Sequence, residues 1–261
     1  MNTFKKSLLA TSLALTLPVV ATVAQAAEVS ANVTLATDYK FRGISQNNTN
    51  PAVQGGFDIA FESGFYAGTW GSVVDFDDPD ETDANFELDY YFGFGGEIND
   101  SLSYDVGYIY YDYPGSDTTT TALFPETAGR DLDYQEVYAS LTFKDLTVGF
   151  AYSDDYWLET GNFYYVYADY GFELPGGFGL GLHYGYNDFE FDSEDTDSKD
   201  AEQAFLSDGE DSYSDYSITL SKSYAGLDFA LSWIDTDLDE DECWGTDWCD
   251  SSVVFSISKS M

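Results

Sequence analysis

The sequence predicts an all-β fold: a single transmembrane antiparallel up-and-down barrel of twelve strands. Three observations support this prediction. Apolar and polar residues alternate with a period of two along most of the chain, which is the side-chain period of a strand. Aromatic residues make up 18% of the sequence, as expected for the aromatic belts of a membrane barrel. Short and long connections follow one another regularly between these segments. A soluble sandwich has no reason to show this pattern.

The N-terminal segment has the features of a cleaved secretory signal. Lys5 and Lys6 precede an apolar run from Ser7 to Ala24, and Ala24-Gln25-Ala26 supplies the small residues of a cleavage site. We therefore expect residues 1–26 to be a signal peptide and residues 27–261 to form one barrel domain. No later segment approaches eighteen uninterrupted apolar residues, so the pattern argues against spanning helices.

The first predicted strand, Glu28–Ser45, sets the period of the chain. Its odd positions carry apolar residues such as Val29, Leu35 and Phe41, and its even positions are mostly polar. A strand that crosses a bilayer at a tilt needs roughly nine to eleven residues, so this segment is long enough to span. Its parity directs Lys40 and Arg42 toward the barrel interior, with the other even positions.

The next strands repeat the alternation, each with aromatic or aliphatic residues on every second position. Short turns are expected at Ser63-Gly64, Asn99-Asp100, Lys144-Asp145 and Pro175-Gly176-Gly177. The predicted strands that follow the first are Ala52–Glu62, Phe65–Phe76, Asn85–Glu97, Ser101–Asp112, Leu132–Phe143, Leu146–Ser153, Asn162–Phe172, Phe178–Tyr186, Tyr213–Ser223, Leu227–Ile234 and Ser251–Met261.

Two lysines test the assignment of faces. Lys222 and Lys259 share parity with lipid-facing residues, but both lie near the ends that the short turns join. A lysine there can extend to the interface at roughly 0 to 1 kcal/mol, against about 2 to 4 kcal/mol at the midplane. The pattern therefore predicts short periplasmic turns and long, acidic extracellular loops.

The chain is strongly acidic, with a formal net charge of −39. Phosphate binding needs a basic patch, so nucleic acid is excluded as a partner. The expected partners are the lipid bilayer, lipopolysaccharide, and small solutes or cations, and assembly into a homo-oligomer is left open. The sequence gives no reason to expect a cofactor.

Two sequence stretches resemble a known family. Ala36 to Gln46 (ATDYKFRGISQ) and Val253 to Met261 (VVFSISKSM), together with the aromatic alternating body, resemble the TorF family of porin-like proteobacterial outer-membrane proteins. The resemblance covers the whole chain after the signal. It implies a location in the outer membrane of a Gram-negative cell and a pore-like role, and it brings no substrate or catalytic residues with it.

The predicted function is a porin-like channel that passes small solutes or ions by passive diffusion, with ion transport favouring cations. Carboxylates dominate the inward-facing positions, and an acidic lumen favours cations. Lys40 and Arg42 either face carboxylates across a constriction or form ordinary cross-strand ion pairs. The deeper carboxylates have fewer basic neighbours and are the better selectivity candidates. The pore-lining candidates are Asp58, Asp105, Asp169, Glu87, Asp89, Glu136, Lys40 and Arg42.

Two other functions, surface adhesion and catalysis, are alternatives to the channel. A non-conducting surface or adhesion protein would use its acidic loops to bind divalent cations. Catalysis is disfavoured because His183 is the sole histidine and has no serine of matching parity beside it. Cys243 and Cys249, in the last loop of an exported chain, predict a disulfide. No metal site is expected, with Asp235, Asp237, Asp239 and Asp241 as weak calcium candidates that lack an EF-hand spacing.

Overall fold

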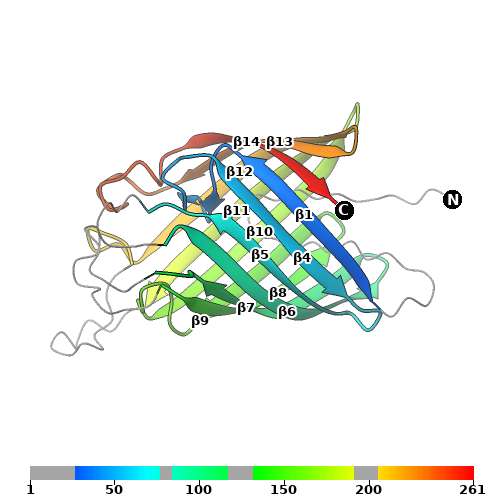
Figure 1. The fold of residues 1–261 in the computed structure, drawn as a ribbon, viewed down its shortest axis with the longest axis horizontal. Coiled ribbons are helices and arrows are strands. Elements are labelled where there is room, and N and C mark those ends of the chain that lie inside the picture. Colours follow the sequence, from blue (N-terminus) through cyan, green and yellow to red (C-terminus); the bar gives the residue numbers. More distant parts are fainter. Residues whose placement is uncertain (1–26, 77–83, 117–131, 191–204) are drawn as a thin grey trace.

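The computed structural model describes residues 27–76, 84–116, 132–190 and 205–261 and is a closed antiparallel barrel. Figure 1 shows the strands running obliquely around it. The predicted fold class and the number of barrel strands are confirmed. The barrel strands are β1 (Glu28–Ala36), β4 (Ala52–Ala60), β5 (Phe65–Val73), β6 (Phe86–Asn99), β7 (Leu102–Asp112), β8 (Tyr134–Phe143), β9 (Leu146–Ser153), β10 (Asn162–Leu174), β11 (Phe178–Glu190), β12 (Ser212–Tyr224), β13 (Leu227–Thr236) and β14 (Ser252–Ser260).

The barrel closes where its first strand meets its last. On one side β1 pairs with β4 along its whole length, from Glu28 opposite Ala60 to Ala36 opposite Ala52. On the other side its pairing with β14 runs only from Asn32 to Ala36. The β1–β14 seam is therefore shorter than the neighbouring β1–β4 pairing.

The connections alternate as predicted, and the two ends of the barrel are named here for them. At the turn end, neighbouring strands are joined by tight turns such as Ala225-Gly226, where both residues have positive φ, 54° and 75°. This is the conformation of the two-residue turns that match the twist of paired strands. The chain's C-terminus lies at this end (Figure 1), and the longer connections lie at the opposite, loop end.

The predicted first strand is wrong in its second half. The barrel strand β1 stops at Ala36, and the chain then turns inward into a small separate sheet of β2 (Lys40–Phe41) and β3 (Ile44–Ser45). Arg42 (φ 47°) and Gly43 (φ 84°) make the turn between these two strands. The alternation continues past Ala36 because Tyr39 and its neighbours are buried inside the barrel, where the same residue types are favoured as on a strand.

The outer face of the barrel is apolar and the inner face is polar. Outward side chains are exposed although they are hydrophobic, with Val29 at 71% and Phe57 at 65% exposure. Such a large exposed apolar surface marks a contact with a partner or a membrane. The two lysines of lipid-facing parity lie at the turn end, where Lys259 Nζ donates to the Gly226 carbonyl at 2.8 Å and Lys222 Nζ lies 4.2 Å from the Phe178 ring centroid.

A search of the described residues for helices long and apolar enough to cross a membrane finds none.

Candidate functional site: the lumen and the mouth hairpin

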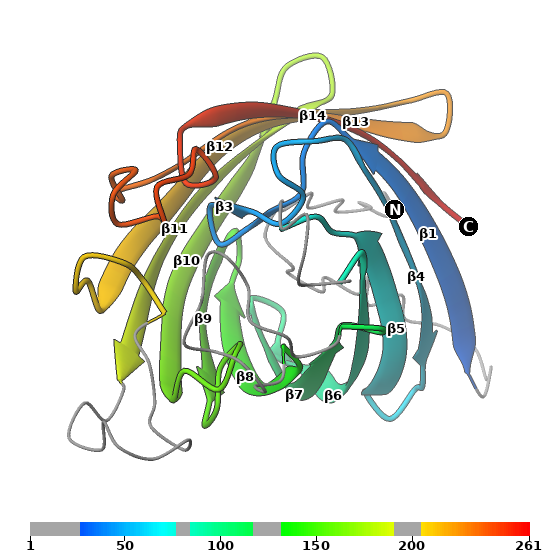
Figure 2. The same cartoon turned by 60° about the vertical axis from the view of Figure 1, so that its left-hand side comes forward.

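Residues 37–51, which we call the mouth hairpin, fold into the loop end of the barrel. Figure 2 shows β3 lying within the opening rather than along the wall. The hairpin reaches several walls: Tyr39 donates a hydrogen bond to Glu87 on β6 at 2.8 Å, and Tyr213 on β12 donates to the Arg42 carbonyl at 3.0 Å. Strands on opposite sides of the opening are therefore tied together through one segment.

Arg42 forms the strongest of these ties. Its guanidinium donates to both carboxylate oxygens of Glu136 on β8, at 2.7 and 2.8 Å, and the two residues are only 6% and 2% exposed. A bidentate pair of this kind is among the strong hydrogen bonds of proteins. The guanidinium carbon also lies 4.4 Å from the ring centroid of Tyr165 and 4.6 Å from those of Phe41 and Phe163. The predicted pairing of Arg42 with a carboxylate is thus present, but it joins an inserted hairpin to the wall and not two strands.

Lys40 points elsewhere. Its ammonium donates to the backbone carbonyls of Trp248 at 2.7 Å and Asp250 at 3.2 Å, and lies 4.0 Å from the Asp38 carboxylate. Burial lowers the pKa of Lys40, an effect that the negative charge of Asp38 opposes. Burial in turn raises the pKa of Asp38. Lys40 therefore fixes the hairpin to the last loop, rather than facing the wall carboxylates as its predicted strand position implied.

The last loop carries the predicted disulfide, which joins Cys243 and Cys249 and is confirmed. Beside it, the Trp248 carbonyl also accepts the Ser45 backbone N–H at 2.9 Å. The Trp248 indole donates to the Asn48 side chain at 3.1 Å. The disulfide-bonded loop thus covers the mouth hairpin from the loop end.

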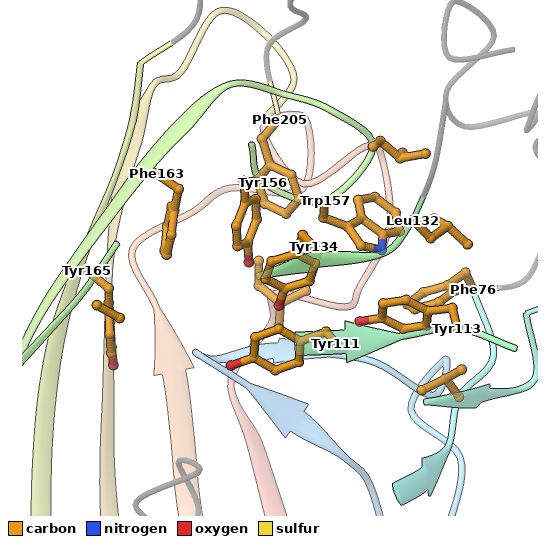
Figure 3. Close-up of a cluster of buried hydrophobic side chains, with 14 of the residues drawn as sticks. Phe76, Tyr111, Tyr113, Leu132, Tyr134, Tyr156, Trp157, Phe163, Tyr165 and Phe205 are labelled. Atoms are coloured by element: carbon orange, nitrogen blue, oxygen red, sulfur yellow. The ribbon is translucent and has the colours of Figure 1, made fainter. Parts of the chain in front are cut away.

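Buried aromatic rings fill the space around the hairpin. Figure 3 shows Phe163 and Tyr165 one above the other, across from Tyr111 and Tyr134. Tyr111 and Tyr134 stack with centroids 4.3 Å apart, and Tyr156 stacks on Phe163 at 4.2 Å. A cavity of about 30 Å³ is left beside Tyr134 and Tyr156. The loop end is therefore packed like a core, with no wide passage through the described residues.

Two carboxylates on β6 lie within this packed region. Glu87 accepts hydroxyl hydrogen bonds from Tyr39 at 2.8 Å and Tyr113 at 3.1 Å. Asp89, which is 0% exposed, has no hydrogen-bond partner for either carboxylate oxygen among the described residues. Both predicted pore-lining residues point inward, but neither meets solvent.

The lumen is open to solvent toward the turn end. Asp58 and Asp105, two of the deeper predicted candidates, are half-buried there. Asp58 accepts a hydrogen bond from Tyr91 at 2.5 Å, and Asp105 accepts one from Tyr66 at 2.7 Å. Each carboxylate thus accepts a hydroxyl that reaches across one intervening strand of the wall.

These tyrosines lie flat on the wall because glycines stand beside them. A Cβ added at Gly68 would lie 2.5 Å from the Tyr91 ring, and one at Gly149 would lie 2.2 Å from the Tyr167 ring. The close approach of an aromatic ring to a strand glycine keeps the ring off the barrel axis. Glycines recur on inward positions of the sequence, but this recurrence alone does not predict which tyrosine packs on which glycine.

Asp169, which was predicted to have fewer basic neighbours than the carboxylates near the mouth, lies against one basic side chain. Its carboxylate accepts from His183 Nδ1 at 2.7 Å, while His183 Nε2 lies 2.9 Å from both Asp215 and the Tyr165 hydroxyl. Asp215 was missed as an inward residue. The tyrosines and serines that flank it obscure the alternation of its strand, although the register of β12 against β11 places it opposite Gly185.

Two of the four weak calcium candidates make hydrogen bonds within the loops. Asp235 accepts the Thr236 N–H at 3.0 Å, and Asp237 accepts the Ser214 N–H at 2.6 Å. In the part of the chain that the structure describes, no group of three or more His, Cys, Asp or Glu side chains is arranged to hold a metal ion. The acidic segment 77–83 and much of the acidic segment 188–211 lie outside the described residues.

Comparison with known proteins shows which family the chain belongs to. A model of the family described as "Bacterial protein of unknown function (Gcw_chp)" matches residues 20–261. The chain belongs to the Gcw_chp family. No curated protein matches the sequence of this Gcw_chp chain. Its assignment to the TorF family stays a prediction.

Among solved structures, the Gcw_chp chain resembles an outer membrane channel from Pseudomonas putida F1. The TM-score is 0.54 at 9% sequence identity, and the match covers 91% of this chain and 96% of that one. It also resembles the KdgM porin, with a TM-score of 0.50 at 7% identity, over 88% of this chain and 97% of that one. At these identities the likeness shows the fold of the Gcw_chp chain alone.

Proposed function

We propose that this chain is a porin-like channel of the Gram-negative outer membrane, through which small solutes and ions diffuse passively. The observation that carries the proposal is the division of the barrel into an apolar exterior and a polar interior. An apolar exterior with no free sheet edge is what a lipid environment requires of strands. Export by a cleaved signal peptide is part of the same proposal.

A preference for cations is the second part of the proposal. The half-buried carboxylates Asp58 and Asp105 face the open part of the lumen, where they attract cations and repel anions. Asp169 contributes less than predicted from the sequence, because His183 lies against its carboxylate at 2.7 Å. The carboxylates at the loop end act on ions only when the mouth hairpin leaves its position.

The experiment is single-channel recording of the refolded chain without residues 1–26, in a planar bilayer under a salt gradient. We expect discrete current steps and a reversal potential of the sign that cation selectivity gives. A correctly folded barrel that carries no current under any applied voltage contradicts the channel.

A second candidate is a non-conducting surface protein whose acidic loops bind divalent cations and lipopolysaccharide. The packed loop end favours it, since the mouth hairpin and the aromatic rings fill the opening. It predicts a silent barrel that gains thermal stability from calcium in proportion to the acidic loop residues present.

We propose no catalytic role for the histidine. Both ring nitrogens of His183 lie within hydrogen-bond distance of Asp169, Asp215 or Tyr165. Among the described residues, no serine or cysteine side chain is hydrogen-bonded to this ring, so it has no nucleophile to activate.

A further inference from the structure

We propose that the wall pocket that holds the Arg42 guanidinium is a binding site for a guanidinium-bearing solute, and that Arg42 is its resident competitor. The proposal names a substrate class for the channel and rests on that proposed function for the route by which the solute arrives. Its chemistry comes from three wall residues on two strands: Glu136 on β8, and Phe163 and Tyr165 on β10.

The pocket belongs to the barrel and its occupant does not. Glu136 presents both carboxylate oxygens inward, and Tyr111 on β7 donates to Oε2 at 3.2 Å, which fixes the carboxylate. The Phe163 and Tyr165 rings lie 4.6 and 4.4 Å from the guanidinium carbon. Figure 3 shows these two rings one above the other across from Tyr111. All four side chains stay with their strands if the mouth hairpin moves.

The geometry suits a planar cation with parallel N–H groups. Two donors meet the two oxygens of one carboxylate at 2.7 and 2.8 Å, which a guanidinium does in one plane and a compact ammonium does not. The ring faces add attraction for a cation, and guanidinium is weakly hydrated, so it enters an aromatic site readily. A neutral planar solute would lack the charge that the buried Glu136 requires.

Glu87 and Asp58, two other inward carboxylates, do not offer the same site. Glu87 is satisfied by the hydroxyls of Tyr39 and Tyr113. Asp58 accepts from Tyr91 at the half-open turn end. The second buried cation of the hairpin, Lys40, donates to backbone carbonyls, and the carboxylate 4.0 Å from it, Asp38, belongs to the hairpin itself, so removal of Lys40 opens no carboxylate pocket on the wall. The Arg42 position is thus distinct from the rest of the hairpin's anchors.

Exchange is favoured because Glu136 is never left without a cation. Departure of Arg42 alone would leave a buried carboxylate with one tyrosine hydroxyl, which is a strongly unfavourable state. A guanidinium solute that takes its place removes this cost. The hairpin then loses its bidentate tie to the wall and keeps its other contacts, among them those of Tyr39, Lys40 and Ser45, so binding of the solute and loosening of the mouth hairpin are linked.

The test compares ethylguanidinium with N-ethylurea, a neutral solute of the same shape, on the refolded barrel in detergent at constant ionic strength. Binding is measured by titration calorimetry to the wild type, Arg42→Ala, Arg42→Gln and Lys40→Ala. We expect ethylguanidinium to bind Arg42→Ala about tenfold or more tightly than the wild type, since the competitor is gone. Arg42→Gln, which keeps the first part of the side chain without the charge, should gain in the same direction if the alanine variant does not fold.

Two further arms decide whether the site acts in the native protein. In the wild type, ethylguanidinium should speed hydrogen exchange of the amides in residues 39–46, whereas N-ethylurea should leave it unchanged. Adding Glu136→Gln to Arg42→Ala should abolish the gain in affinity. Lys40→Ala should bind no more tightly than the wild type, although it also loses a hairpin anchor.

The proposal is overturned if Arg42→Ala gains no affinity, if N-ethylurea binds as well as ethylguanidinium, or if Lys40→Ala gains as much. It is also overturned if wild-type hairpin exchange does not respond. Because binding is read without a membrane, its failure is separate from that of the channel: a barrel that binds but never conducts keeps the site and loses the porin function, and a conducting barrel without binding does the reverse.

Discussion

The two halves of the barrel interior use the same side chains in different ways. At the loop end, Glu87, Asp89 and Glu136 are buried under the mouth hairpin, with exposures of 2%, 0% and 2%. At the turn end, Asp58 and Asp105 remain half-buried and reach the open lumen. At the loop end, Glu87 and Glu136 therefore hold the mouth hairpin, and Asp89 is buried with no hydrogen bond among the described residues, whereas the carboxylates at the turn end stay partly exposed to the lumen. All these carboxylates face inward, so their position along the barrel axis decides whether they are buried under the mouth hairpin or exposed to the lumen.

The largest effect on conductance should come from removing the core of the mouth hairpin. Replacement of residues 39–46 by a glycine-serine segment of equal length removes Arg42, Lys40 and Tyr39 together. Since the narrowest section limits conduction, we expect single-channel conductance to rise roughly threefold or more. An unchanged current would show that the mouth hairpin does not block the loop end, and would contradict the difference between the two halves. The matched control is the double variant Asp58→Asn/Asp105→Asn, which leaves the hairpin in place and should not raise conductance.

Loss of the disulfide should loosen the loop end without opening the barrel. For the double variant Cys243→Ser/Cys249→Ser, a short closed loop predicts a local loss of about 2 kcal/mol, or roughly thirtyfold faster exchange. The amide to follow by hydrogen exchange is that of Ser45, which bonds the Trp248 carbonyl. Reduction of the wild type should give the same result, while amides of the turn-end strands should not respond. Equal acceleration at both ends would contradict the division.

A methyl group on the wall tests the tyrosine–glycine packing toward the turn end. In Gly149→Ala the new Cβ would lie 2.2 Å from the Tyr167 ring. We expect a loss of about 1.5 kcal/mol in the free energy of unfolding, from overpacking. The control is Gly95→Ala, also inward, where the nearest atom would be at 3.5 Å. Urea unfolding of both variants should separate them, and equal losses would show that the ring contact does not matter.

The smallest expected effect is on selectivity. Neutralising both half-buried carboxylates, Asp58→Asn with Asp105→Asn, should lower the ratio of cation to anion permeability about twofold, because one local field is weakened among many charges. Reversal potentials under a salt gradient measure it. Asp100→Asn makes the same change of charge type in an exposed turn, and should leave the ratio as it is. A change in the permeability ratio with Asp100→Asn but not with the lumen pair would contradict the assignment of Asp58 and Asp105 to cation selectivity.

Much of the wall could be predicted from the sequence, because the period of two and the short turns are local properties. The twelve barrel strands lie where the alternation places them, and most bounds agree within a few residues. The mouth hairpin could not be predicted this way. Tyr39 and Phe41 continue the apolar pattern of β1 but pack against aromatic rings from distant strands. A local pattern shows which side chains are apolar, not whether lipid or the barrel interior covers them.

The candidate site divides in the same manner. Facing inward was predictable for Glu136 and Asp58 from parity alone. The bond from Arg42 to Glu136 joins positions 94 residues apart, and the stacking of Phe163 and Tyr165 on it depends on the hairpin's turn. Asp215 escaped notice because its strand alternates weakly, and the link between Asp169 and His183 needed the register of β10 against β11.

The position of the mouth hairpin in the chain imposes an order on assembly. The hairpin directly follows β1, so it is made before any of the strands that hold it. Its receivers on β6, β8 and β12 surround a common space only after the short β1–β14 seam has closed. The bond from Arg42 to Glu136 therefore ties the segment after the first strand to a strand made much later in the chain.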